Sequence, residues 1–200
     1  MVKDERQGRP SASGMQRLFL CPGSWQAEKK CPVDEESEDA ALGTMLHACM
    51  EHGTTPENPE DAEAVAWCRE MEDSLCNKYL GCSYIRYREL RLFERGDRLF
   101  SGKPDLVAVG VRKAFVVDYK FGRLPVAAAE CNLQLSALAV LVMDMFEEGA
   151  VDEVFVCILQ PYASWKEPAV CRYTRESVEQ ARAFFRACIE QAQDEHAPLK

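Results

Sequence analysis

The chain has 200 residues, 47% of them hydrophobic and 28% charged, a balance typical of globular domains and unlike that of disordered or fibrous chains. Its formal net charge of −9 argues against a protein that coats nucleic acid without specificity, because such binding requires surplus Lys and Arg. Residues 1–10 contain no apolar segment typical of a secretory signal, and the longest apolar run ends at Asp144, too soon to span a membrane. We expect one cytoplasmic domain over residues 1–200.

The first part of the chain, residues 11–82, is expected to be helical, and the polar residues 1–10 are expected to be loose. A short helix and a turn are predicted before Trp25, followed by an acidic loop over residues 31–38. Ser37 is a typical N-cap for a helix that ends before Gly53. A second amphipathic helix is predicted over residues 61–80.

The second part, residues 83–200, is expected to form the sheet core and its closing helices. The hydrophobic period changes to two at residue 83, which is typical of strands, and Gly96-Asp97 indicates a hairpin turn. Strands are predicted over residues 83–94, 98–101, 105–109, 114–119, 153–159 and 170–173, and helices over residues 126–148, the longest, and 174–194. This order predicts an α/β fold with a mixed central sheet flanked by helices.

Ten cysteines are present, but no two of them are spaced as C-x-x-C. The sequence therefore lacks the signature of zinc ribbons and thioredoxin-like redox sites. Cys49, Cys131 and Cys157 stand among apolar residues, so we expect them to be small buried side chains of a protein in a reducing compartment.

Positive charge is concentrated between residues 86 and 123, a segment that contains ten basic residues and five acidic ones. A polyanion could be attracted to this segment while the rest of the chain repels it. The alternative interpretation, strands with solvated Arg on one side, is the better one when charge alone is considered.

Two acids stand in adjacent predicted strands, in Pro104-Asp105 and in Asp118-Tyr119-Lys120. Carboxylates at neighbouring strand ends can converge on one hard cation, and Glu89 in the preceding strand can supply a third. Lys120 follows Asp118 by two residues and should lie on the same side of the strand. A bound Mg²⁺ at this place could activate water for phosphodiester cleavage. In the alternative interpretation, Asp105 is an ordinary acid in a turn, Asp118 and Lys120 form a surface ion pair, and Glu89 is a solvated strand residue.

The pattern resembles the PD-(D/E)xK nuclease superfamily, and within it the RecB-like branch. The matching motifs are Pro104-Asp105 with Asp118-Tyr119-Lys120, a G-x-x-x-H helix at Gly43–His47, and Gln134-Leu135 at the place of a Q-x-x-x-Y helix, although Leu138 stands where that pattern has Tyr. The chain is also similar to an uncharacterised family of phage and prophage RecB-like exonucleases, over residues 11–175. Its shared blocks are Ser13–Ser24, Leu42–His47, Asp118–Gly122, Asn132–Leu135 and Gln160-Pro161.

The resemblance implies a restriction-endonuclease-like core and a Mg²⁺- or Mn²⁺-dependent DNA nuclease, expected to be an exonuclease. It implies DNA as partner, a phage single-strand annealing or recombination protein as a further one, and the cytoplasm of a bacterial host. The implied catalytic residues are Glu89, Asp105, Asp118, Lys120 and Gln134. The implied metal ligands are His47, Glu89, Asp105, Asp118 and the backbone carbonyl of Tyr119. The implied DNA contacts are Arg88, Arg91, Lys103, Arg123 and Gln134.

Some nucleases of this branch carry an iron–sulfur cluster, but Cys157, Cys171 and Cys188 are too widely spaced for one to be expected here. Two other functions stay open: a nuclease fold that binds nucleic acid or protein without catalysis, and a metal-free acidic scaffold. The sequence leaves the polarity of cleavage, exonuclease or endonuclease action, DNA or RNA, and the oligomeric state undecided. The nuclease hypothesis requires the carboxylates of Glu89, Asp105 and Asp118 and the Lys120 amine to lie within about 6 Å of one point.

Overall fold

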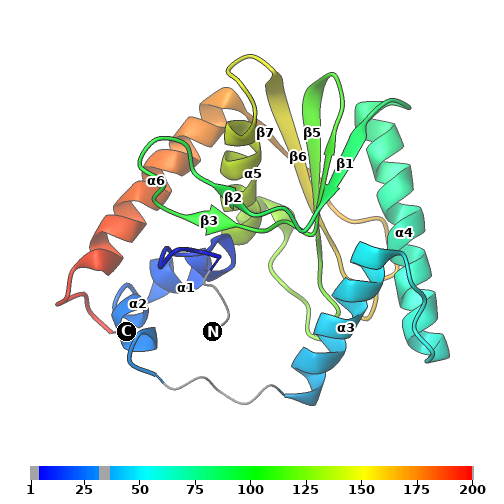
Figure 1. The fold of residues 1–200 in the computed structure, drawn as a ribbon, viewed down its shortest axis with the longest axis horizontal. Coiled ribbons are helices and arrows are strands. Elements are labelled where there is room, and N and C mark those ends of the chain that lie inside the picture. The colour runs from blue at the N-terminus through cyan, green and yellow to red at the C-terminus, as the bar shows by residue number, and fades with distance from the viewer. Residues whose placement is uncertain (1–4, 32–36, 200) are drawn as a thin grey trace.

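A five-stranded mixed sheet forms the centre of the computed structural model, which describes residues 5–31 and 37–199 (Figure 1). The strands lie in the order β1-β4-β5-β6-β7, and β5 and β6 are parallel while the other neighbours are antiparallel. Their bounds are Ile85–Arg88 (β1), Leu106–Val109 (β4), Arg112–Tyr119 (β5), Val151–Leu159 (β6) and Cys171–Thr174 (β7). The predicted α/β class with a mixed central sheet is confirmed.

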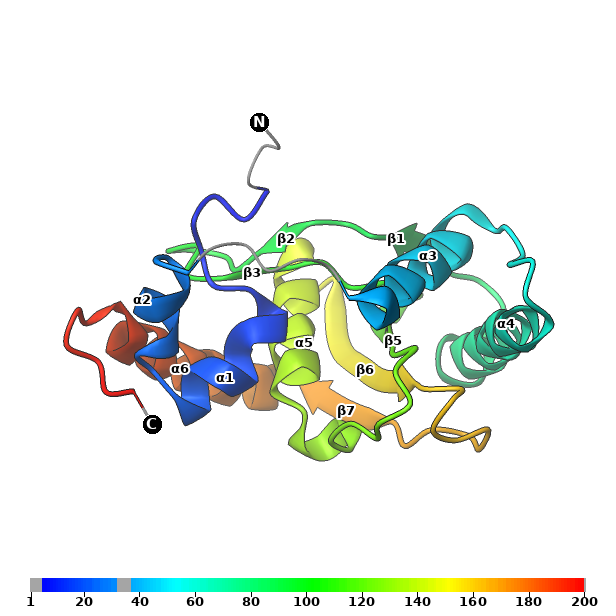
Figure 2. The same cartoon turned by 90° about the horizontal axis from the view of Figure 1, so that it is seen from below.

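One face of the sheet is covered by α5 (Leu133–Met145) and α6 (Arg175–Gln193), together with the N-terminal segments (Figures 1 and 2). These segments are η1 (Ala12–Gly14), α1 (Met15–Leu20) and α2 (Ser24–Glu28). α5 contacts β6 on one side and α1 and α6 on others, which explains why it is apolar around most of its circumference.

The opposite face is covered by α3 (Glu38–His52) and α4 (Pro59–Leu80). α3 begins and ends as predicted: Ser37 Oγ accepts a hydrogen bond from the Ala40 N–H, and Gly53 adopts a left-handed conformation with φ of +73°. α4 begins two residues earlier than predicted, because the side chain of Asn58 caps it and Pro59 fits the first turn. The acidic loop expected over residues 31–38 lies largely outside the described residues.

The predicted helix over residues 126–148 is wrong in its first part. α5 begins only at Leu133, where the Asn132 side chain caps it, after a 3₁₀ turn η2 (Ala129–Cys131). The preceding loop is fixed by Gln160, which donates hydrogen bonds to the carbonyls of Gly122 (3.0 Å) and Leu124 (2.6 Å). The longest of the described helices is therefore α4, and Cys131 is exposed on η2 rather than buried.

The predicted strand over residues 83–94 is interrupted. β1 ends at Arg88, Glu89 takes a left-handed conformation with φ of +51°, and pairing resumes in a separate hairpin. The hairpin consists of β2 (Leu92–Phe93) and β3 (Ser101–Gly102), and its turn contains Gly96 with φ of +90°, as the sequence predicts. Within the described part of the chain, we find no helix with the length and apolar character needed to cross a membrane.

Candidate metal centre and active site

The site lies where β4 begins and β5 ends. In the antiparallel register of these strands Leu106 stands opposite Val117, so Asp105 and Asp118 form the next pair and lie beside each other. Asp105 is also tied to β5 directly, because its Oδ2 accepts a hydrogen bond of 2.6 Å from the backbone N–H of Tyr119. The two acids of the sequence motif therefore meet at one end of the sheet.

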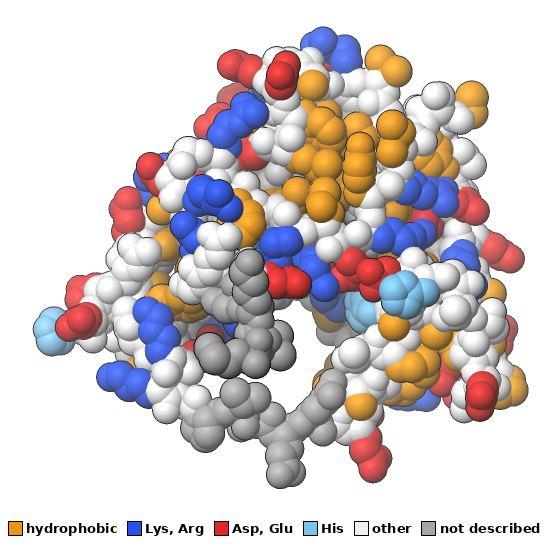
Figure 3. All heavy atoms as spheres, in the orientation of Figure 1, with side chains coloured by type: hydrophobic (Ala, Val, Ile, Leu, Met, Phe, Trp, Pro, Cys, Tyr) orange, Lys and Arg blue, Asp and Glu red, His pale blue; other side chains and the backbone are white. Residues whose placement is uncertain are grey.

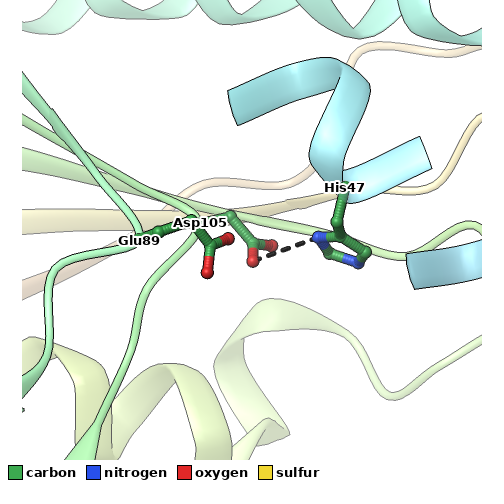
Figure 4. Close-up of side chains that lie close together, drawn as sticks. All are labelled: His47, Glu89 and Asp105. Carbon is green, nitrogen blue, oxygen red and sulfur yellow. Dashed lines mark ion pairs between the residues drawn. The ribbon is translucent and has the colours of Figure 1, made fainter. Parts of the chain in front are cut away.

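Three side chains from three parts of the fold lie together, with Asp105 between Glu89 and His47 (Figure 4). The potential ligand atoms of His47, Glu89 and Asp105 all lie within 4.8 Å of one another. His47 projects from α3, with its Nδ1 3.2 Å from Asp105 Oδ1. An imidazole nitrogen and two carboxylates form a donor set that fits a divalent cation with oxygen preference. These residues form a candidate metal site.

Asp118 lies outside that three-residue set and is held by its own partners. Gln134 of α5 donates a hydrogen bond from its Nε2 to Asp118 Oδ1, and Lys120 Nζ lies 2.6 Å from Oδ2. Lys120 therefore lies on the same side of the chain as Asp118, as strand alternation predicts. Asp118 is only 3% exposed. Burial raises its pKa to about 6, with a further rise from the charge of Asp105 and an opposing effect of Lys120.

The negative charge gathered at the site also shifts the pKa values of His47 and Glu89. Burial lowers the pKa of His47, but the hydrogen bond to Asp105 and the charges of Asp105 and Asp118 outweigh this effect, so the pKa lies above its ordinary value. Burial and the charge of Asp105 raise the pKa of Glu89, while Lys103 Nζ, 2.6 Å from Glu89 Oε2, lowers it. A cation placed among these carboxylates would relieve this repulsion.

A family model described as the PD-(D/E)XK nuclease superfamily matches residues 9–200, nearly the whole chain. The chain belongs to the PD-(D/E)XK nuclease superfamily. The resemblance stated from the motifs is thereby confirmed at the level of the superfamily. No curated protein matches the chain.

Solved structures of other proteins also match the chain. A predicted exonuclease from Eubacterium rectale superposes with a TM-score of 0.56 at 12% identity, over 97% of this chain and 85% of that one. An alkaline exonuclease from Laribacter hongkongensis gives a TM-score of 0.39 at 10% identity, over 92% of this chain and 90% of that one. The complex of that enzyme with dAMP gives a TM-score of 0.45 at 9% identity, over 94% of this chain and 89% of that one. At these identities the first likeness shows a shared fold.

The three residues of the candidate metal site, His47, Glu89 and Asp105, line a groove of about 510 Å³ between α3 and the strand ends. Figure 3 shows acidic and basic side chains side by side at the middle of the molecule, next to a histidine. The α3 side of the groove is lined by the small residues Ala40, Gly43, Thr44 and Ala48. Sequence analysis missed this lining, although the helical spacing of small residues around His47 was a readable signal.

The structure brings together three of the five residues expected to contact DNA. Arg91, Lys103 and Gln134 line a second pocket of about 290 Å³, which also includes the hydroxyl-bearing Ser11 and Ser13. Arg91 Nε is buried and has no hydrogen-bond partner within residues 5–31 and 37–199. Lys103 lines both this pocket and the α3 groove, so the two spaces adjoin at its side chain.

The other two expected DNA contacts point elsewhere. Arg88 extends to the α4 face of the sheet, where its Nη2 lies 2.7 Å from the buried carboxylate of Glu72. Its charge is thus paired with a buried carboxylate, so we leave Arg88 out of the DNA contacts proposed below, and its expected contact with DNA stays a prediction. Arg123 is largely exposed on the loop after Lys120 and pairs with Glu60 of α4 at 3.0 Å.

Proposed function

We propose that this protein is a divalent-metal-dependent deoxyribonuclease that hydrolyses phosphodiester bonds, and that it acts as an exonuclease. The observation that carries the proposal is the meeting of His47, Glu89 and Asp105 beside the Asp118–Lys120 pair, at the signature motif of a nuclease superfamily. Superfamily membership alone leaves room for an inactive fold. The retention of three carboxylates and a lysine in one place favours catalysis.

His47, Glu89, Asp105 and Asp118, with the backbone carbonyl of Tyr119, would hold Mg²⁺ or Mn²⁺. When bound, such an ion lowers the pKa of a water ligand and offsets charge that develops on the phosphate. Lys120 lies beside Asp118 and would orient the attacking water or compensate negative charge on the scissile phosphate.

Gln134 fixes the orientation of Asp118 through its hydrogen bond, so its first role is to position that carboxylate. Because it also lines the pocket that contains Arg91 and Lys103, the same side chain can contact a bound strand. Lys103 and Arg91 would bind phosphates on either side of the cleaved bond. We keep Arg123 as an outer DNA contact, because its guanidinium is exposed on the loop that follows Lys120.

The exonuclease part of the proposal is supported by the name of the Eubacterium rectale protein, which is described as a predicted exonuclease and shares the fold. We further propose that residues 1–200 form one nuclease domain, which is supported by the family match over residues 9–200. The resemblance to phage and prophage RecB-like proteins supports a role in DNA recombination inside a bacterial cell, alongside a strand-annealing partner.

The proposal is tested with purified protein and two DNA substrates, one linear and end-labelled and one covalently closed. We expect Mg²⁺ or Mn²⁺ to support degradation of the linear DNA only, and EDTA to prevent it. Lys120→Ala should abolish cleavage, while Lys78→Ala, which removes an exposed lysine that pairs with Glu167, should leave it unchanged. Cleavage of the closed circular DNA would show that the protein acts as an endonuclease rather than as an exonuclease. DNA binding without any cleavage would favour the non-catalytic alternative.

A further inference from the structure

Directly behind the site, on the α4 face of the sheet, lies a buried polar cluster formed by Glu72, Arg88 and Tyr119. Glu72 is only 1% exposed. Its Oε1 and Oε2 accept hydrogen bonds of 2.7 and 3.0 Å from Arg88 Nη2. The Tyr119 hydroxyl also donates to Glu72 and accepts a hydrogen bond of 3.2 Å from Arg88 Nη1. A second arginine, Arg86, lies 3.3 Å from Glu72 Oε1.

Each strand residue of this cluster is adjacent in sequence to proposed metal ligands. Tyr119 stands between Asp118 and Lys120, and its N–H donates to Asp105 Oδ2 at 2.6 Å. Because neighbouring residues of a strand point to opposite sides, the Tyr119 ring lies toward α4 while Asp118 contacts α5. The cluster therefore holds β5 from behind at the residue that joins Asp105 and Asp118.

The second strand residue, Arg88, immediately precedes Glu89. Glu89 has a φ of +51°, a left-handed conformation that a non-glycine residue keeps only where its surroundings impose it. Its N–H donates to the Asp105 carbonyl at 3.3 Å. β1 lies at the edge of the sheet and ends at Arg88, so the ion pair with Glu72 anchors the last strand residue before the turn that presents Glu89.

We propose that Glu72 is a positioning residue for the metal site: by binding Arg88 and Tyr119 together, it fixes the spacing between the β1 and β5 ends that carry Glu89 and Asp118. This inference rests on the proposed function, since it concerns the same ligands. If the buried ion pair had a purely structural role, its removal would lower the stability of the protein without changing the affinity of the site for metal. The two roles therefore differ in a measurable way.

The test compares Mn²⁺ affinity by calorimetry, in the absence of DNA, with thermal stability and with kcat and KM on DNA. Tyr119→Phe removes one hydroxyl, and Glu72→Gln removes the charge that Arg88 binds. We expect both variants to bind Mn²⁺ about tenfold to hundredfold more weakly, the range typical of groups that orient metal ligands. Their kcat should fall at saturating Mn²⁺, while their KM for DNA should stay close to that of the wild type.

Glu94→Gln is the matched control. Glu94 is also 1% exposed and accepts a hydrogen bond of 2.9 Å from Arg182 of α6, on the other face of the sheet. We expect this variant to lose thermal stability but to keep its Mn²⁺ affinity within about twofold, because no metal ligand depends on the bond.

Mn²⁺ affinity unchanged in Tyr119→Phe and Glu72→Gln, at temperatures where both are folded, would overturn the inference. Should Glu72→Gln fail to fold, Tyr119→Phe alone decides, because a single oxygen is removed. Wild-type protein that binds Mn²⁺ but leaves DNA intact would refute the proposed function and leave the positioning role open to the affinity test. Wild-type protein without Mn²⁺ affinity would refute both.

Discussion

Asp118→Asn is expected to stabilise the metal-free protein near neutral pH while it abolishes cleavage of DNA. Burial raises the pKa of Asp118 from 3.8 to about 6, which means that the folded protein disfavours the carboxylate that it must hold. A difference of about two units corresponds to roughly 3 kcal/mol at 1.36 kcal/mol per unit. Asparagine keeps an oxygen that can accept the hydrogen bond from Gln134. We expect a gain of about 1–3 kcal/mol, or roughly 2–12 °C in Tm for a chain of this length.

The gain should depend on pH in a defined direction. Because the folded pKa of Asp118 lies above the unfolded one, the wild type loses stability as pH rises from about 4 to about 6. The variant lacks this titration. Its advantage should therefore be complete above about pH 7 and should shrink toward about pH 4, where the wild-type carboxyl is protonated in both states.

The assay is thermal unfolding followed by circular dichroism, in EDTA and across this pH range, and then with added Mn²⁺. The ion should raise the Tm of the wild type more than that of the variant, because it binds the folded state through the carboxylate. Asp144→Asn serves as the control. The Asp144 side chain is 8% exposed, but Arg182 binds both of its oxygens, so this variant should lose stability. A lower Tm for Asp118→Asn in EDTA near pH 8 would refute the reasoning.

Three further outcomes are expected. His47→Ala should weaken Mn²⁺ binding at least about tenfold in calorimetry, because it removes one of the three grouped donors; unchanged affinity would exclude the imidazole as a ligand. Leu138→Tyr should lower the free energy of unfolding by about 1–3 kcal/mol without raising turnover, since Leu138 is fully buried and packs against Gly102; faster cleavage would show that the position faces the substrate. Arg91→Ala should lower DNA affinity and reduce the slope of log affinity against log salt by about one. Arg123→Ala should have a smaller effect on both. Wild-type affinity in Arg91→Ala would show that the DNA strand binds elsewhere.

The parts of the site that the sequence could predict are those whose geometry is local to a strand. Asp118 and Lys120 share a side because alternate residues of an extended chain do so, and Lys120 keeps this direction as the first residue after β5. Asp105 could be placed beside Asp118 because short antiparallel connections bring neighbouring strand ends together. The same rules predicted the mixed sheet and both ends of α3, whose cap residues act within one helical turn.

The errors arose where a residue distant in sequence determines the conformation. Arg88 was expected on a DNA-binding face, but Glu72, on a helix that precedes the sheet, draws its guanidinium inward. Nothing in the alternation of residues 83–94 indicates this partner, nor the left-handed conformation of Glu89 next to it. Likewise the loop before α5 has a helix-compatible sequence, but Gln160, more than thirty residues later, binds the backbone of Leu124 and Val126.

α3 supplies His47 while its buried residues, among them Leu46 and Met50, pack mainly on α4 rather than on the strands that carry the acids. The candidate centre thus joins two substructures, and we expect α3 to open more readily than the central strands, because a helix with few packing partners exchanges its amide hydrogens faster. An ion shared by His47 and Asp105 would connect them and slow the opening. Hydrogen exchange of the α3 amides would then report metal occupancy, and the supply of metal would set how long α3 stays in place as a wall of the groove.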